Sequence, residues 1–536
     1  MYDLIIRNGF VIDGSGAPGS FADVAVRGDK VAKIAPHIDE QAVKTLDAAG
    51  AIVVPGLIDP HVHEEWVCFV DGGFEHFLRQ GVTTLVNGNC GHSVLPGPRD
   101  NFIDYFWGNG LLSTRQKDDY KKRFPEWHDY ASYMAAVEKA GTNINLASLI
   151  GHGSLRWTVM KGAHDRPPTP AEAAEIERHL RLAMEQGAMG VSFGLDYVPS
   201  RYAKLDELVS VTKIVAEYDG VAAAHLRHAL GIKEATEEFV NVGRLSGAKI
   251  QVSHLKSTCP EAFEVARKAV DEEGLRVRVD TIPRSTGHCT SKSRLILFIM
   301  ALSDELFAGG AEGVKKALST PEGRAVVKKD AYIFAGDKAD LFVVRSEDPK
   351  LEAKSVKAIA AERGVDPDEC MLDLLGDDLD YTFWLGGPSR KDFPATGHVA
   401  TIIANPYVSV GTDEIMGDPE YPFDWYELQR RGGFPIFFRM YRAAGVATEE
   451  IIRRNTTMVA EHFGLSGRGR LAEGFFADIA VIDAEAYDFP PATMESYKNP
   501  LATASGVRHV VVNGKLALES GRLLATRSGR TIKRGQ

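Results

Sequence analysis

The sequence contains few cysteines for its length. Its 536 residues include five, and none stands in a Cys-x-x-Cys pair: Cys68, Cys90, Cys259, Cys289 and Cys370. A sparse and odd-numbered set argues against a disulfide framework and favours a reducing compartment. We therefore expect a cytoplasmic protein.

The chain also lacks a hydrophobic segment that could cross a membrane. No apolar run approaches the roughly 20 residues that a bilayer requires. Residues 1–10 lack the charged and apolar regions of a secretory leader. The net charge is −11, from 62 basic and 73 acidic residues, and no basic stripe suggests nucleic-acid binding. We expect no membrane and no nucleic-acid partner, and leave a homo-oligomer open.

A glycine-rich phosphate-binding turn is missing after the first buried strand, which argues against a doubly wound nucleotide-binding sheet. Instead, strand-like runs alternate with helical patterns such as residues 170–186, which open with Thr169 as N-cap and proline at N1. The eight strand candidates are residues 52–58, 83–86, 144–150, 189–193, 221–224, 249–252, 276–279 and 407–410. This alternation predicts an α/β fold of the (β/α)8 TIM-like barrel type.

The length of 536 residues, with a mass of 58.5 kDa, favours a large catalytic domain with smaller lobes. A short β-branched run closed by Asn-Gly occurs near each end, so we expect one small β-sandwich domain from residues 1–54 and 466–536. The hydrolase barrel would occupy residues 55–465. Within it, residues 281–400 separate the seventh and eighth strands by far more than a loop needs. They are expected to form an inserted subdomain that covers the active site.

Two histidines follow the first predicted strand of the barrel. An apolar run ends in Asp59-Pro60-His61-Val62-His63. On a strand, side chains two residues apart point to the same face, so both imidazoles can reach one metal ion. The strand's carboxyl end is also where barrel enzymes build their active sites.

Other metal-binding residue types follow other predicted strands. Cys90 follows the second strand, His225 the fifth, His254 the sixth and Asp413 the eighth. Thiolate, imidazole and carboxylate form a ligand set that suits Zn²⁺ better than Mg²⁺ or Ca²⁺. Bound zinc lowers the pKa of water to about 7 and polarises a carbonyl oxygen, while a carboxylate such as Asp413 can move the proton to a leaving amine. The pattern predicts metal-assisted hydrolysis of an amide.

Each of these residues also has an ordinary structural interpretation. Taken alone, Cys90 would be a small buried hydrophobe, and His225 or His254 a satisfied core histidine. Asp413 could simply cap a turn. Their shared position at strand ends favours the metal site over these alternatives.

These motifs together resemble the amidohydrolase superfamily and, within it, the N-acyl-D-amino-acid deacylases, also called D-aminoacylases. The resemblance covers nearly the whole chain. It rests on residues 59–63, 80–84, 89–91, 151–156, 194–199, 225–227, 253–256, 464–469 and 477–478.

The resemblance implies a function and a ligand set. The reaction would be zinc-dependent hydrolysis of an N-acyl-D-amino acid to a carboxylate and a free D-amino acid, with a metal-bound water as nucleophile. Cys90, His225 and His254 would hold the tightly bound zinc, and His61, His63 and Asp413 would line a second, weaker position. Asp413 would be the general acid/base.

Two alternatives remain at this stage. One is a related amidohydrolase acting on a dipeptide, a cyclic amide or another N-acyl compound. Hydantoinase-like relatives use a carbamylated lysine at the end of the fourth strand, whereas residues 194–197 here read Gly-Leu-Asp-Tyr, with no lysine until Lys204. The other is an inactive barrel that serves as a scaffold. It would have lost metal ligands, but all six positions hold competent residues.

Four residues are candidates for substrate binding. Arg227 and Lys256 lie two positions after proposed ligands, where their charge could bind a substrate carboxylate. The family resemblance suggests the same contact for Tyr197. After the seventh strand the family usually carries Asp-x-Tyr-Pro-Tyr, but this chain has Arg284 and neither tyrosine. Arg284 would replace a lost carboxylate contact or recognise an additional acidic group, and the preferred amino acid is left open.

Overall fold

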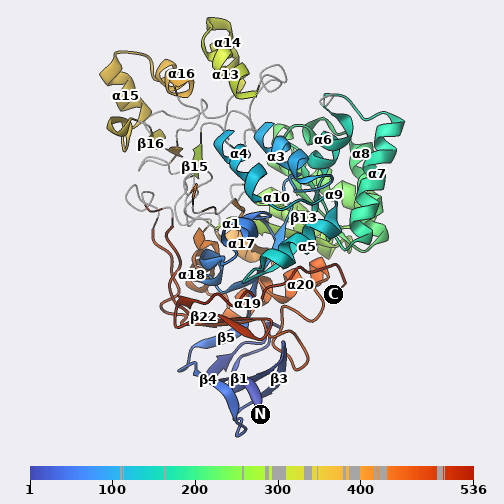
Figure 1. Ribbon diagram of the computed structural model, residues 1–536, viewed down its shortest axis with the longest axis vertical. Coiled ribbons are helices and arrows are strands. Elements are labelled where there is room, and N and C mark those ends of the chain that lie inside the picture. Colours follow the sequence, from blue (N-terminus) through green and yellow to red (C-terminus); the bar gives the residue numbers. More distant parts are fainter. Residues whose placement is uncertain are drawn as a thin grey trace.

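The computed structural model has three parts along its long axis (Figure 1). A sheet built from both ends of the chain lies at the bottom, parallel strands with their helices lie in the middle, and a small helical part lies at the top. The described residues are 1–108, 112, 114–161, 165–255, 259–283, 289–292, 310–330, 341–346, 348–377, 382–385, 399–415, 418, 420–421, 431–491, 499 and 501–535.

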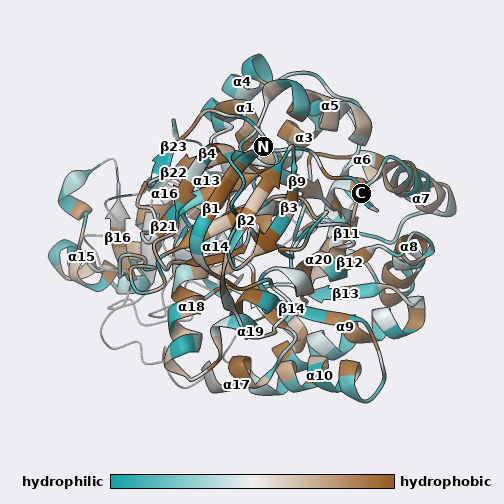
Figure 2. Cartoon of the chain, turned by 90° about the horizontal axis from the view of Figure 1, so that it is seen from below, coloured by the Kyte–Doolittle hydropathy of each residue, from teal (hydrophilic) through white to brown (hydrophobic). Residues whose placement is uncertain are grey.

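The two ends of the chain share one nine-stranded sheet. Its order is β23 (Arg522–Leu523), β22 (Lys515–Glu519), β21 (Val507–Val512), β20 (Ile479–Ile482), β5 (Ile52–Pro55), β1 (Tyr2–Val11), β2 (Ser20–Arg27) and β3 (Lys30–Ala35), with β4 (Ala42–Asp47) also beside β1. The antiparallel register sets Leu4 opposite Val26 and Ile6 opposite Val24, and all four side chains enter one apolar cluster. Figure 2 shows apolar residues gathered along β1 and β2. The sandwich arrangement and the limits of the terminal domain stay predictions.

The central strands are parallel, and their neighbour order is consistent with a (β/α)8 barrel. They are β6 (Leu57–Asp59), β8 (Val82–Asn87), β9 (Asn145–Ser148) with β10 (Ile150–Gly151), β11 (Gly190–Gly194), β12 (Val221–His225), β13 (Lys249–Val252), β14 (Val277–Thr281) and β18 (Val408–Val410). The apolar sequence runs that predict these strands are buried on both faces, as helix-covered parallel strands must be.

Two of the predicted strands are divided in the structure. The run 52–58 splits at Gly56 between the terminal sheet and the parallel strands, where a Cβ would overlap the side chain of Thr83. The run 144–150 splits at Leu149, because its first half pairs with β8 and its second half with β11. One continuous apolar run can therefore serve two neighbours.

A short ladder joins the last parallel strand to the first. β19 (Glu414–Ile415) pairs in parallel with β7 (Val62–His63), and the Asp413 amide donates to the His61 carbonyl at 2.8 Å. On the opposite side of this ladder, the buried carboxylate of Glu414 pairs with Arg431 at 2.9 Å. The pairing brings the eighth strand's end beside the first.

Helices cover the parallel strands. They are α1 (Val67–Asp71), α2 (Glu75–Leu78), α3 (Arg99–Gly108), α4 (Thr114–Arg123), α5 (Tyr130–Ala140), α6 (His152–Met160), α7 (Pro170–Glu185), α8 (Leu205–Glu217), α9 (Ile232–Ser246), α10 (Pro260–Asp271), α17 (Val399–Ala404), α18 (Gly433–Ala443), α19 (Thr448–Arg454) and α20 (Thr457–Phe463), with 3-10 turns at Ser200–Tyr202 and His228–Leu230. The predicted start of α7 is confirmed, since Thr169 and Glu172 form a reciprocal capping box. Among the described residues, no helix is both long and apolar enough to span a bilayer.

The described residues between β14 and β18 form a small unit of their own. β15 (Cys289–Lys292), β17 (Thr382–Leu385) and β16 (Leu341–Arg345) make an antiparallel sheet, accompanied by α13 (Gly310–Leu318), α14 (Pro321–Asp330), α15 (Val356–Arg363), α16 (Pro367–Asp377) and the 3-10 turn Pro349–Leu351. Helices α13–α16 lie at the end of the molecule opposite the terminal sheet (Figure 1). That this unit covers the active site stays a prediction.

A buried polar network joins the terminal sheet to the parallel strands. Arg468 forms an ion pair with Asp478, and their side chains are 4% and 5% exposed. Asp478 also accepts from the Asn513 amide at 2.8 Å and from the Asn145 side chain in β9 at 3.2 Å. Asn513 in turn donates to Asn145 at 2.7 Å. Removal of one member would leave buried polar groups without partners.

We expect the substitution Asp478→Ala to destabilise the protein strongly. It would leave the buried guanidinium of Arg468 without its carboxylate, a change that typically costs about 3–5 kcal/mol. The shift of the urea unfolding midpoint measures the effect. Glu217→Ala is the control, because Glu217 pairs with Arg181 on the surface and should shift the midpoint far less. Equal shifts in the two variants would contradict a structural role for the network.

Candidate metal centre

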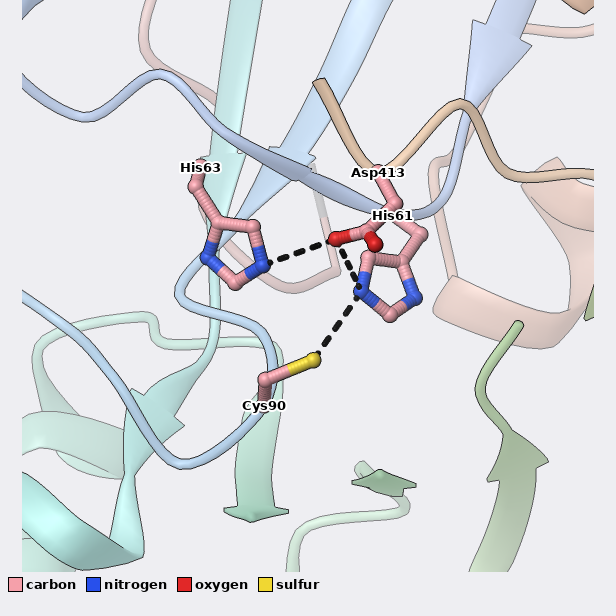
Figure 3. Close-up of side chains that lie close together, drawn as sticks. All are labelled: His61, His63, Cys90 and Asp413. Atoms are coloured by element: carbon pink, nitrogen blue, oxygen red, sulfur yellow. Dashed lines mark hydrogen bonds and ion pairs between the residues drawn. The ribbon is translucent and has the colours of Figure 1, made fainter. Parts of the chain in front are cut away.

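Four predicted metal ligands converge where the first and last parallel strands meet (Figure 3). His61 Nε2 lies 3.3 Å from the Cys90 sulfur and 3.4 Å from Asp413 Oδ1. His63 Nε2 lies 3.2 Å from the same carboxylate oxygen. All four side chains are buried and turn their donor atoms toward one another.

Cys90 also belongs to a second group of donor atoms. Its sulfur lies 3.3 Å from His254 Nε2, which is 2.9 Å from His225 Nδ1. The three donors come from the ends of the second, fifth and sixth parallel strands. The structure thus brings all six predicted ligand residues together, with Cys90 between the two groups.

The backbone turns sharply at three of these residues. Cys90, His254 and Asp413 have φ angles of 53°, 34° and 53°. These values lie in the left-handed region, which residues other than glycine rarely adopt. The Cys90 turn is held close to the fourth strand, since a Cβ on Gly91 would meet the backbone of Gly194. Backbone strain of this kind concentrates at functional sites.

A buried carboxylate that the strand-end pattern does not single out lies behind the donors. Asp280, at the end of β14, accepts from the His254 amide at 2.7 Å and from the Gln251 side chain at 2.7 Å. Its Oδ1 also lies 3.2 Å from His61 Nδ1, close but not aligned as a hydrogen bond. Asp280 therefore fixes the position of one donor histidine and faces the ring of another.

Asp59 secures the same region from the first strand. Its carboxylate accepts from the Thr412 hydroxyl at 2.5 Å and from the His61 amide at 3.0 Å. Burial raises the pKa of Asp59 to about 7, although these hydrogen bonds act to lower it. The only signal for these supporting acids in the sequence is an aspartate at the end of an apolar strand.

The proton positions follow from burial and neighbouring charge. Burial opposes charge on His61, but Asp280 and Cys90 outweigh it and raise its pKa well above the usual value. Burial lowers the pKa of His254 well below its usual value. Burial also raises the pKa of the Cys90 thiol to about 11, although His61 opposes this shift. A metal ion that binds the thiolate must therefore displace a proton.

The donor set fits zinc. One sulfur, imidazole nitrogens and a carboxylate oxygen are the ligand types that Zn²⁺ selects, and they lie within 4.8 Å of one another inside each group. Three or four such donors can surround one ion and leave a position for a substrate. The arrangement can therefore hold a catalytic metal.

Tyr197 faces the second group of donors. Its hydroxyl lies 2.8 Å from His225 Nδ1, and the two rings are 4.3 Å apart. This position is compatible with the substrate contact expected from the sequence, which stays a prediction.

Arg227 is engaged elsewhere. Its guanidinium donates to the carbonyls of Arg201 and Ala203 at 2.6 and 2.9 Å, and to Glu238 at 3.3 Å. These contacts fix the loop after β11 and do not favour a direct contact with substrate. Lys256 and Arg284 lie outside the described residues.

Comparison with known proteins shows the family. The amidohydrolase family matches residues 44–324 and 333–517, which is most of the chain. The chain therefore belongs to the amidohydrolase family.

Within this family the chain is similar to D-amino-acid deacylases over nearly its whole length. It is 28% identical to a D-aminoacylase of Alcaligenes xylosoxydans xylosoxydans over 99% of this chain and 98% of the relative. It is 29% identical to an N-acyl-D-glutamate deacylase of the same organism over 96% and 93%.

Solved structures of D-amino-acid deacylases are also similar to this chain. The N-acyl-D-glutamate deacylase of Bordetella bronchiseptica, complexed with zinc and a phosphonate mimic of the tetrahedral intermediate, has a TM-score of 0.75 and 26% identity over 99% of both chains. A D-aminoacylase with a binuclear metal centre has a TM-score of 0.73 and 26% identity over 100% of both. An L-hydantoinase from Arthrobacter aurescens, at 17% identity and a TM-score of 0.53, shares the fold.

The substitution Cys90→Ala tests the proposed ligand shared by both groups. We expect this variant to lose its zinc on dialysis. Each zinc ion that is added back near neutral pH should release about one proton fewer than in the wild type, because there is no thiol to ionise. Zinc content after dialysis and calorimetric titration in buffers of different ionisation enthalpy measure the two effects.

Cys68→Ala is the matched control, since Cys68 is also a buried free thiol but belongs to neither donor group. It should retain zinc and its proton release. Full zinc occupancy in Cys90→Ala would reject Cys90 as a ligand.

Proposed function

We propose that this protein is a zinc-dependent hydrolase that cleaves the amide bond of an N-acyl-D-amino acid, releasing a carboxylate and a free D-amino acid. The observation that carries the proposal is the buried convergence of six donors around Cys90 at the ends of parallel strands. The similarity to D-aminoacylase and N-acyl-D-glutamate deacylases supports the substrate class.

The proposed architecture is a closed (β/α)8 barrel over residues 55–465. A terminal domain of residues 1–54 and 466–536 would lie at one end of the barrel, and residues 281–400 would cover the active site. The parallel strand order and the β7–β19 ladder support the closed barrel. A cytoplasmic location and a homo-oligomer remain predictions.

The proposed metal assignment follows the two donor groups. Cys90, His225 and His254 would hold the tightly bound zinc, and His61, His63 and Asp413 would line a second position. When bound, zinc supplies a Lewis acid that polarises a carbonyl and lowers the pKa of water to about 7.

Asp413 would move the proton in this reaction. Its carboxylate lies among the donors and its side chain retains 10% exposure, so a substrate nitrogen can approach it. It would accept the proton of the attacking water and deliver it to the leaving nitrogen. The Asp413 amide is fixed by the His61 carbonyl beside the β7–β19 ladder, which supports a fixed position for the carboxylate.

Tyr197, Lys256 and Arg284 would contact the substrate, with the carboxylate as the common target. The Tyr197 hydroxyl supports this assignment by its position beside His225. A cyclic-amide substrate is less well supported, since the end of β11 carries Asp196 and Tyr197 where hydantoinase-like enzymes carry a modified lysine.

The direct test is amino-acid release from paired N-acetyl-D- and N-acetyl-L-amino acids by the zinc-loaded protein. Release from the D substrates alone is the expected result, and the preferred side chain would identify the specificity. Ring opening of hydantoins to N-carbamoyl amino acids, with no amino-acid release from either acyl series, would overturn the proposal in favour of a cyclic-amide hydrolase.

The substitution Asp413→Asn should lower kcat by about 10²–10⁴-fold, because the amide cannot shuttle a proton. Zinc at the Cys90, His225 and His254 group should be retained, which metal analysis would verify. Wild-type turnover in this variant would assign the proton transfer to another residue.

A further inference from the structure

Asp196 touches a donor histidine on the side away from the metal centre. Its Oδ2 lies 3.1 Å from His225 Nε2 and 2.6 Å from His228 Nδ1, and its Oδ1 accepts from the His228 amide at 2.9 Å. The side chains of His225, Asp196 and His228 are 5%, 17% and 18% exposed. The carboxylate is therefore fixed from two sides between a buried and a half-buried imidazole.

The two nitrogens of His225 have different surroundings. Nδ1 lies 2.9 Å from His254 Nε2, within the group that includes Cys90, and 2.8 Å from the Tyr197 hydroxyl. Nε2 faces Asp196. A neutral imidazole carries one proton, and the ring nitrogen beside a carboxylate retains it. This leaves a lone pair on Nδ1, which can bind a metal ion in the candidate centre or accept from the Tyr197 hydroxyl when no ion is bound.

We propose that Asp196 is a positioning residue that selects the metal-binding tautomer of His225 and thereby sets the affinity of the Cys90–His225–His254 site for zinc. The inference rests on the proposed metal centre and adds to it a residue outside the six donors. His228 assists by holding the carboxylate through its amide and its ring.

A separate cation between Asp196, His225 and His228 is the competing interpretation, since their donor atoms also lie within 4.8 Å of one another. It would require both nitrogens of His225 to be without a proton. A hydrogen bond needs only the neutral ring, so the geometry favours the hydrogen bond.

The test compares zinc affinity in the full-length wild type, Asp196→Asn and Asp196→Ala. Competition with a chelator of known affinity gives the dissociation constant. We expect zinc to bind about 10–100-fold more weakly in Asp196→Ala, the usual effect of removing such a partner. Asp196→Asn should lose less zinc affinity than Asp196→Ala, because asparagine retains an oxygen acceptor although it lacks the charge.

Glu207→Gln provides the matched control. Glu207 also accepts from a buried histidine, His152, at 3.1 Å, but that histidine belongs to no donor group. This variant should leave zinc affinity unchanged, whatever it does to the unfolding midpoint.

Cobalt substitution adds a spectroscopic readout. If Asp196 orients His225, the visible d–d bands and the thiolate charge-transfer band of the cobalt protein should shift in the Asp196 variants and stay unchanged in Glu207→Gln. A lower unfolding midpoint without a change in affinity or spectrum would show that Asp196 only holds its loop, and would overturn the inference. Loss of one zinc equivalent with unchanged affinity of the rest would favour the separate cation site.

The outcomes for this inference and for the proposed function are distinguishable. A wild-type protein that binds no zinc would reject the metal centre itself. A wild type that binds zinc and releases D-amino acids, with Asp196 variants of equal zinc affinity, would reject only the role of Asp196.

Discussion

The geometry of the candidate metal centre depends on the backbone pairing of the first and last parallel strands. The Asp413 amide donates to the His61 carbonyl at 2.8 Å, and Thr412 donates to Asp59 across 353 positions of sequence. A shift of one residue would exchange the faces of the β7–β19 ladder. Asp413 would then leave the donors, and Glu414 would leave its buried ion pair with Arg431. Polar partners on both faces therefore fix one register.

Two donor histidines are backed by carboxylates in the same way. His61 faces Asp280 and His225 faces Asp196 with the ring nitrogen opposite the donor group. Burial alone would raise the pKa of Asp196, but hydrogen bonds from His225 and His228 hold it well below the usual value. In metal sites, carboxylates at such positions orient the imidazole rings and place negative charge near the bound cation. The centre is therefore organised in two layers of side chains.

Much of this could be predicted because parallel strands and the residues at their ends leave a clear pattern in the sequence. Apolar runs followed by Cys90, His225, His254 and Asp413 indicate both the strands and the donors, since parallel strands end on one face. The partners of the imidazoles could not be assigned, because Asp196 and Asp280 resemble many other aspartates after strands. Arg227 illustrates the limit of position alone: it stands near the mouth, yet its guanidinium binds two loop carbonyls.

The sequence by itself determined the residue types of the centre, the parallel α/β pattern and the family resemblance. These depend on local periodicity and on chemistry that each side chain carries wherever it lies. Only the tertiary structure decided the sharing of Cys90 between two groups, the left-handed turns at the donors and the nitrogen that each histidine directs inward. Those features depend on contacts between strands that are far apart in the chain, and local periodicity does not specify such contacts.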